Sequence, residues 1–143
     1  MANANGRKDN FMNINKKKIS WMIGSLFVIF LAYVIYSADK GSLPLFIRKM
    51  YMFPGGDKAG HIVLLGLLAF FVNYFLYPRY LRVFGKTVLI GSLIVFCLIT
   101  IEEVSQIFIS KRTFDLLDLF CSYLGIIAGD ITVKYMKRER GLL

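Results

Sequence analysis

Four long apolar runs, separated by short clusters of charged and polar residues, dominate this chain of 143 residues. A helix needs about 20 apolar residues to cross the roughly 30 Å hydrocarbon core of a bilayer. Runs suited to that task lie at about 19–37, 58–77, 87–109 and 113–135. Since 57% of the residues are hydrophobic and only 19% are charged, the composition departs from that of a soluble domain. The sequence therefore predicts an all-α polytopic membrane protein with four transmembrane helices in a bundle.

The basic residues predict how these spans are oriented. Five Lys or Arg residues precede the first span, three lie between the second and third, and four follow the last, whereas the other two loops share six. The positive-inside rule then places both termini in the cytoplasm. Residues 37–60 and 110–112 are expected to face outward. The net charge of +9 follows from these flanking clusters, which contact anionic head groups, so no nucleic-acid partner is expected.

The chain divides into three parts. Residues 1–18 are polar, basic and Asn-rich and are predicted to be a flexible cytoplasmic N-terminus. Residues 19–136 form the membrane domain, and residues 137–143 form a basic cytoplasmic tail. In the long outward loop, residues 43–53 are apolar with two basic residues. They suit either a short amphipathic helix at the membrane interface or an ordinary loop packed on the bundle.

Polar side chains interrupt the third and fourth spans. Glu103 and Gln106 are three residues apart and share a helix face. Asp115, Asp118 and Ser122 form a stripe along the start of the fourth span. A carboxylate at membrane depth is costly and needs a partner or a water-filled cavity. These residues are therefore candidates for a site or for a structural network.

Two glycines continue the stripe of the fourth span. Gly125 and Gly129 follow Ser122 on the same helix face. Their spacing is that of a small-xxx-small helix contact, in which two backbones approach closely. Helix packing is therefore the predicted role of both glycines.

The second span begins with the only histidine of the chain. Asp57 and His61 are one helical turn apart, with Lys58 between them, and Arg112 lies in the short turn that joins the third and fourth spans. All of these residues are predicted to meet the polar stripes at the outward end of the bundle. Capping of helix starts by Asp57 and Asp115, or a salt-bridge network that locks three helices, would also explain the pattern.

Taken in order, the motifs resemble the VanZ-like family. The pattern reads D-K-x-x-H from Asp57 to His61, E-x-x-Q from Glu103 to Gln106 and R-x-x-D-x-x-D from Arg112 to Asp118, followed by the two glycines. Ser122 stands where the family usually has Asn, and Ser110-Lys111 replaces its usual Pro-Gly. The resemblance implies a small bacterial cell-membrane protein of the envelope. The family's namesake is associated with low-level resistance to the glycopeptide antibiotic teicoplanin.

Several functions fit these residues. Lys58 and Arg112 could hold an anionic group of a lipid, a lipid-linked cell-wall precursor or a glycopeptide at the outer leaflet. Alternatively, His61, oriented by Asp57, could be the general base of an enzyme acting on a lipid-linked substrate. The His and carboxylates could also hold a divalent metal ion, although no cofactor is expected because Lys58 and Arg112 compete for the same acids. A proton relay is disfavoured because the acids gather at one end of the spans.

Overall fold

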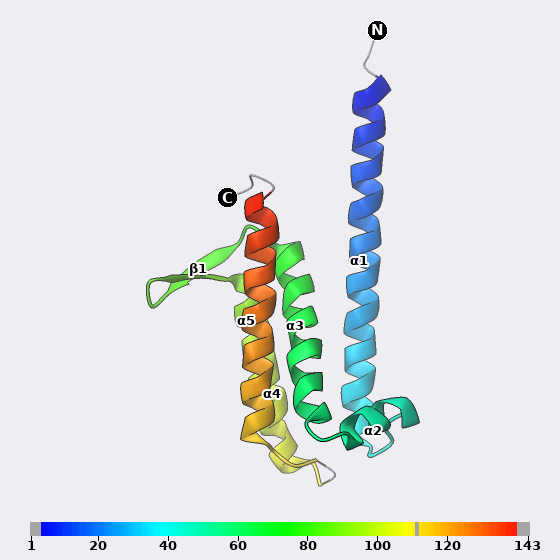
Figure 1. The fold of residues 1–143 in the computed structure, drawn as a ribbon, viewed down its shortest axis with the longest axis vertical. Helices are drawn as coiled ribbons and strands as arrows, with labels where there is room; N and C mark the ends of the chain where they lie inside the picture. Colours follow the sequence, from blue (N-terminus) through cyan, green and yellow to red (C-terminus); the bar gives the residue numbers. More distant parts are fainter. Residues whose placement is uncertain (1–3, 111, 140–143) are drawn as a thin grey trace.

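The structure is a computed structural model that describes residues 4–110 and 112–139. It is mostly helical, with one small hairpin (Figure 1). The elements are α1 (Ala4–Asp39), α2 (Leu45–Met52), α3 (Gly56–Leu76), β1 (Tyr80–Val83), β2 (Lys86–Leu89), α4 (Ile90–Ser105), the 3-10 turn η1 (Gln106–Phe108) and α5 (Leu116–Glu139).

Within the described residues, four helical segments are long and apolar enough to cross a membrane. They are Lys18–Asp39, Gly56–Leu76, Ile90–Phe108 and Leu116–Glu139. Many large apolar side chains point outward from them, including Leu26, Leu98 and Ile127. Such surfaces suit lipid, so the chain has the character of a membrane protein.

The two ends of the helical part differ. We call one end the loop end, where residues 40–55, 109–110 and 112–115 lie between the helices. We call the other end the hairpin end, where β1 and β2 project sideways and α5 finishes (Figure 1). The start of α1 extends beyond the other helices on this same side.

Helices α3 and α5 pack closely, and two glycines of α5 lie in their contact. A Cβ atom added to Gly125 would collide with the carbonyl oxygen of Ile62 and lie 3.0 Å from the amide nitrogen of Gly66. A Cβ atom on Gly129 would lie 2.9 Å from the amide nitrogen of Phe70. The glycines therefore let the two backbones meet. Helix α4 packs on both, and the shared core consists of Leu65, Ala69, Val95, Ile99 and Ile126.

Helix α1 is attached to α3 through aromatic side chains in its middle. Trp21 stacks on Phe75 with ring centroids 4.2 Å apart, and Phe27 and Phe71 approach to 5.7 Å. Nearer the loop end, α1 and α3 instead share a cavity. The attachment of α1 thus leaves room beside α3 at that end.

Residues 80–89 form an antiparallel hairpin, which corrects part of the predicted third span. Residues 87–89 belong to β2, and the helix begins only at Ile90. Tyr80 pairs with Leu89 and Val83 with Lys86. The turn needs positive φ at both central residues, and φ is 48° at Phe84 and 74° at Gly85. β-branched residues around this turn favour strands over a continuous helix.

The start of α4 is capped by side chains from two other helices. Asp130 of α5 accepts a hydrogen bond from the Leu89 amide at 2.9 Å, and Asn73 of α3 accepts one from the Ser92 amide at 2.9 Å. The Ser92 hydroxyl donates to Asp130 and accepts from Asn73. Lys134 pairs with Asp130 on the same helix. First-turn amides lack partners within their own helix, so these contacts satisfy amides at the start of α4.

Other boundaries also differ from the sequence predictions. The first helix begins at Ala4 and so includes much of the segment predicted to be flexible, because extending an existing helix is far easier than nucleating one. The fourth helix begins at Leu116, not at residue 113. Its last turn contains the first residues of the predicted tail, and residues 140–143 lie outside the described part, as does Lys111.

The segment that the sequence left open, residues 43–53, contains the helix α2. Its apolar side chains Leu45, Phe46, Met50 and Met52 are exposed, beside the exposed Arg48 and Lys49. An exposed apolar face next to basic residues favours a position at the membrane interface.

Candidate functional site

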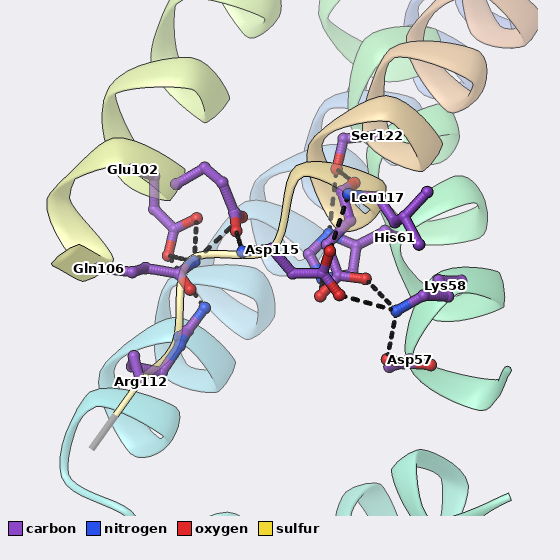
Figure 2. A network of polar contacts seen from close by, with 11 residues as sticks. Asp57, Lys58, His61, Glu102, Gln106, Arg112, Asp115, Leu117 and Ser122 are labelled. Atoms are coloured by element: carbon purple, nitrogen blue, oxygen red, sulfur yellow. Dashed lines mark hydrogen bonds and ion pairs between the residues drawn. The ribbon is translucent and has the colours of Figure 1, made fainter. Parts of the chain in front are cut away.

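The predicted polar residues meet at the loop end, on the facing ends of α3, α4 and α5. Figure 2 shows two groups, with Asp57, Lys58 and His61 on α3 and Glu102 and Gln106 by α4. The chain from Arg112 into α5 runs between them, and Asp115 lies in the middle (Figure 2). The two groups therefore share one cluster that joins three helices.

Lys58 is the centre of the first group. Its Nζ donates to Asp57 at 2.8 Å, to Asp118 at 2.9 Å and to Asp115 at 3.1 Å. These three contacts match the three protons of an ammonium group. Lys58 is thus the counter-ion of three carboxylates and holds the start of α3 against the start of α5.

His61 lies deeper, next to Ser122 and Asp118. The Ser122 hydroxyl donates to the backbone carbonyl of Asp118 at 2.9 Å, and His61 Nδ1 lies 3.0 Å from the Ser122 oxygen. With the hydroxyl proton directed at the Asp118 carbonyl, Nδ1 is the donor to Ser122. His61 Nε2 then faces Asp118 at 3.8 Å. The sequence paired His61 with Asp57, but the acid that faces the ring is Asp118, because Asp57 turns to Lys58.

The second group contains a buried carboxylate and a buried amide. Only 1% of Glu103 and 3% of Gln106 is exposed. Gln106 donates to Glu103 at 3.1 Å and to Glu102 at 3.2 Å, and Glu103 accepts the Asp115 amide at 3.2 Å. The buried side chains of Glu103 and Gln106 therefore stabilise the contact between α4 and the start of α5.

Arg112 connects this group to the end of α1. Its guanidinium lies 3.4 Å from Glu102 and 3.3 Å from Asp39. Both contacts are long and each involves one nitrogen, which is weaker than a bidentate pair. The arginine thus keeps donor groups for another partner.

Asp115 caps α5. Its Oδ1 accepts the Leu117 amide at 2.8 Å, the geometry expected of an N-cap, and its other oxygen meets Lys58. The Leu117 amide, followed by the Lys58 ammonium, holds the pKa of Asp115 below its ordinary value of 3.8. By contrast, Asp57 is not the cap of α3: the cap position is Gly55, with φ of 76°.

A cavity of about 500 Å³ opens beside the cluster, between α1, α3 and α4. Its inner wall is apolar and includes Leu31, Val34, Leu64 and Ile99. Its other wall carries both signs of charge, from Arg48, Asp57, His61, Glu102, Arg112 and Asp118. Lys58, Glu103, Asp115 and Ser122 are not among its lining residues. The predicted residues therefore separate into those that line a cavity and those that support them.

Sequence reasoning missed two contributors to this site. Arg48 comes from α2 and Asp39 from the end of α1. Asp39 follows an apolar run, which indicates the end of a helix. Arg48 lies in an amphipathic segment, which indicates a position at the membrane interface. Neither signal indicates that the side chain approaches Arg112 or the cavity.

No group of three or more His, Cys, Asp or Glu side chains within residues 4–110 and 112–139 is arranged to hold a metal ion. Among the three aspartates the position of a cation is taken by the Lys58 ammonium. Comparison of the chain with protein-family models, curated proteins and solved structures finds no match. The functional argument therefore starts from the geometry of the cavity.

Proposed function

We propose that this chain is a VanZ-like bacterial envelope protein that binds an anionic amphiphile, a lipid-linked or glycopeptide-type molecule, at the outer leaflet. Both termini would be cytoplasmic, as the excess of basic residues at the hairpin end supports. The loop end and its cavity would then face outward. A link to glycopeptide resistance, including teicoplanin, comes from the resemblance of the motifs.

The main support is the two-sided cavity. Its volume of about 500 Å³ lies within the roughly 300–1,000 Å³ typical of ligand sites. Leu31, Val34 and Leu64 offer an apolar surface to an acyl or prenyl chain, while the polar wall lies toward the loop end. A molecule with a greasy tail and a polar head matches this division.

The charges favour a head group with an anion and several hydrogen-bond donors. Arg48 forms no ion pair with any described residue, and Arg112 has only two long contacts. These two guanidinium groups, and not the fully engaged Lys58, would meet a phosphate or carboxylate. Glu102, Asp57 and Asp118 would accept hydrogen bonds from sugar hydroxyls, amides or an ammonium group.

Replacing Arg48 by Gln tests this assignment without breaking an observed ion pair. We expect the Arg48→Gln and Arg112→Gln variants to bind a polyprenyl phosphate, or teicoplanin, about tenfold more weakly or worse, since each loses a charge-assisted hydrogen bond. Binding can be followed by the intrinsic fluorescence of the purified protein.

The matched control is Lys49→Gln, which removes a neighbouring charge on α2 that does not line the cavity. It should bind like the unchanged protein. If it weakens binding as much as Arg48→Gln, attraction is due to general surface charge and the assignment is wrong. The melting temperature of each variant separates loss of binding from loss of fold.

A second candidate function is catalysis by His61. In the tautomer whose Nδ1 donates to Ser122, Nε2 would accept a proton at the cavity. Ser122 itself is fully buried and outside the cavity lining, so it is a poor nucleophile and the attacking group would be water or a substrate hydroxyl. The reaction class would be hydrolysis or transfer on a lipid-linked substrate.

His61→Gln separates binding from catalysis. If His61 is a general base, the variant should bind ligand normally and form product roughly 10²–10⁴-fold more slowly. If the chain only binds its ligand, resistance in cells expressing the variant should equal that of cells with the unchanged protein. Unchanged resistance at equal protein level would remove the enzyme hypothesis.

A further inference from the structure

A second cavity lies at the opposite end of the molecule, between the hairpin and the last turns of α5. It measures about 530 Å³. We call it the hairpin groove, and its polar lining consists chiefly of Arg82, Lys134, Arg138, Tyr77, Tyr80 and Tyr135. The cluster described above contributes nothing to it, so the groove is a separate feature of the fold.

The charge of the hairpin groove is positive. No acidic residue is among its lining residues. Lys134 is neutralised by Asp130 and also donates to the Thr87 carbonyl. Arg82 and Arg138 form no ion pair with any described residue. Two guanidinium groups with unused donors therefore face one groove, an arrangement suited to a phosphate group.

The surroundings of the groove favour a position at a membrane surface. The hairpin exposes Tyr80, Leu81 and Phe84, and Phe84 at its tip is fully exposed. Lys137 lies 4.4 Å above the ring of Tyr74, at the end of the neighbouring helix α3. Exposed aromatic residues beside basic ones are typical of the layer where lipid head groups lie. Figure 1 shows the hairpin projecting sideways near the ends of α3 and α5, in agreement with that position.

We propose that the hairpin groove binds the phosphate of an anionic membrane lipid, with Arg82 and Arg138 as its ligands. The Tyr80 hydroxyl can donate a hydrogen bond to the glycerol part of the head group or accept one from it. The apolar side chains of the hairpin then contact the upper acyl chains. This lipid site lies at the end opposite the cavity at the loop end, and it does not depend on the function proposed for that cavity.

The experiment measures the melting temperature of the purified protein in a neutral detergent during titration with dioctanoyl phosphatidylglycerol. Saturable stabilisation is expected, and dioctanoyl phosphatidylcholine should give much less. For the double variant Arg82→Gln, Arg138→Gln, the apparent dissociation constant should rise by at least about tenfold, because two charge-assisted contacts are lost.

The matched control is the double variant Arg79→Gln, Lys86→Gln, which removes one exposed charge just before the hairpin and one within it, both outside the groove lining. It should retain binding within about twofold, because exposed charges that do not line the groove are screened by salt. Equal weakening in both double variants, or equal stabilisation by phosphatidylcholine, would overturn the proposal. So would equal stabilisation by inorganic phosphate, which would indicate a site for the free anion. If the groove double variant does not fold, the single variants Arg82→Gln and Arg138→Gln carry the same comparison.

Discussion

Replacing Gly125 by valine is expected to prevent the normal packing of α3 against α5 and to remove most of the folded protein. The Cβ atom of any residue at this position collides with the Ile62 carbonyl and approaches the Gly66 amide. Both neighbours are backbone atoms within a helix, so they cannot move aside as a flexible side chain can. Overpacking typically costs about 1–3 kcal/mol, and a backbone collision lies at or above the upper end of that range. The measurement is the yield of monodisperse protein and its melting temperature in detergent.

The control for this prediction is Ala128→Val, three residues further along α5. Ala128 is exposed on the surface of the helix, so added methyl groups meet only lipid or detergent. Its yield and melting temperature should stay close to those of the unchanged protein. Equal behaviour of the two variants would contradict the role of Gly125 as a close-contact residue.

Replacing Lys58 by methionine is expected to have the second large effect. Methionine keeps much of the length of the side chain but removes the ammonium that binds Asp57, Asp115 and Asp118. Three carboxylates then face one another without a cation, and the starts of α3 and α5 repel each other. A lower melting temperature at about pH 7 is expected, together with weaker ligand binding because Asp57 and Asp118 also line the cavity.

The direction in which the melting temperature changes with pH distinguishes charge repulsion from a simple loss of packing. In the unchanged protein, the pKa of Asp115 is lowered, so its contribution to stability is present above 3.8 and is lost as the pH falls through the lower, folded-state value. In the Lys58→Met variant, the repelling carboxylates take up protons as the pH falls, so its melting temperature should rise between about pH 7 and about pH 5.

Two further variants complete the test of Lys58. Lys58→Arg keeps the positive charge and should retain more stability than Lys58→Met, although its planar group suits three separate acceptors less well. Adding Asp118→Asn to Lys58→Met removes one of the repelling charges and should restore part of the lost stability. If neither change alters the melting temperature, the ion cluster contributes little to the stability of the fold.

The sequence predicted the helical character of the chain, because an apolar run of about 20 residues has the length that a helix needs to cross a bilayer. It failed at residues 87–89, where an apolar run is continuous in sequence but changes from strand to helix. The turn at Phe84 and Gly85 determines that change, and a hydropathy pattern does not report it. The length of the apolar runs therefore located the spans, whereas turn geometry determined the start of α4.

Most members of the candidate site were predictable from the sequence, but the way they pair was not. Spacings of three and four residues indicate which side chains share a helix face, and so brought Glu103, Asp118 and His61 to one end of the spans. Which acid meets His61 depends on how far α3 and α5 are rotated and shifted, and that is set by the contacts of Gly125. Lys58 consequently became the partner of three aspartates, while Arg48, from a separate short helix, reached the cavity.

The tertiary caps at the start of α4 have a consequence for how the chain enters a membrane. The Leu89 amide depends on Asp130, a residue made 41 positions later. Until α5 has emerged, the first turn of α4 can satisfy that donor only with water, so this turn must wait in the hydrated surface layer. The hydrogen bonds at the start of the third span are therefore completed only after the fourth span has been made.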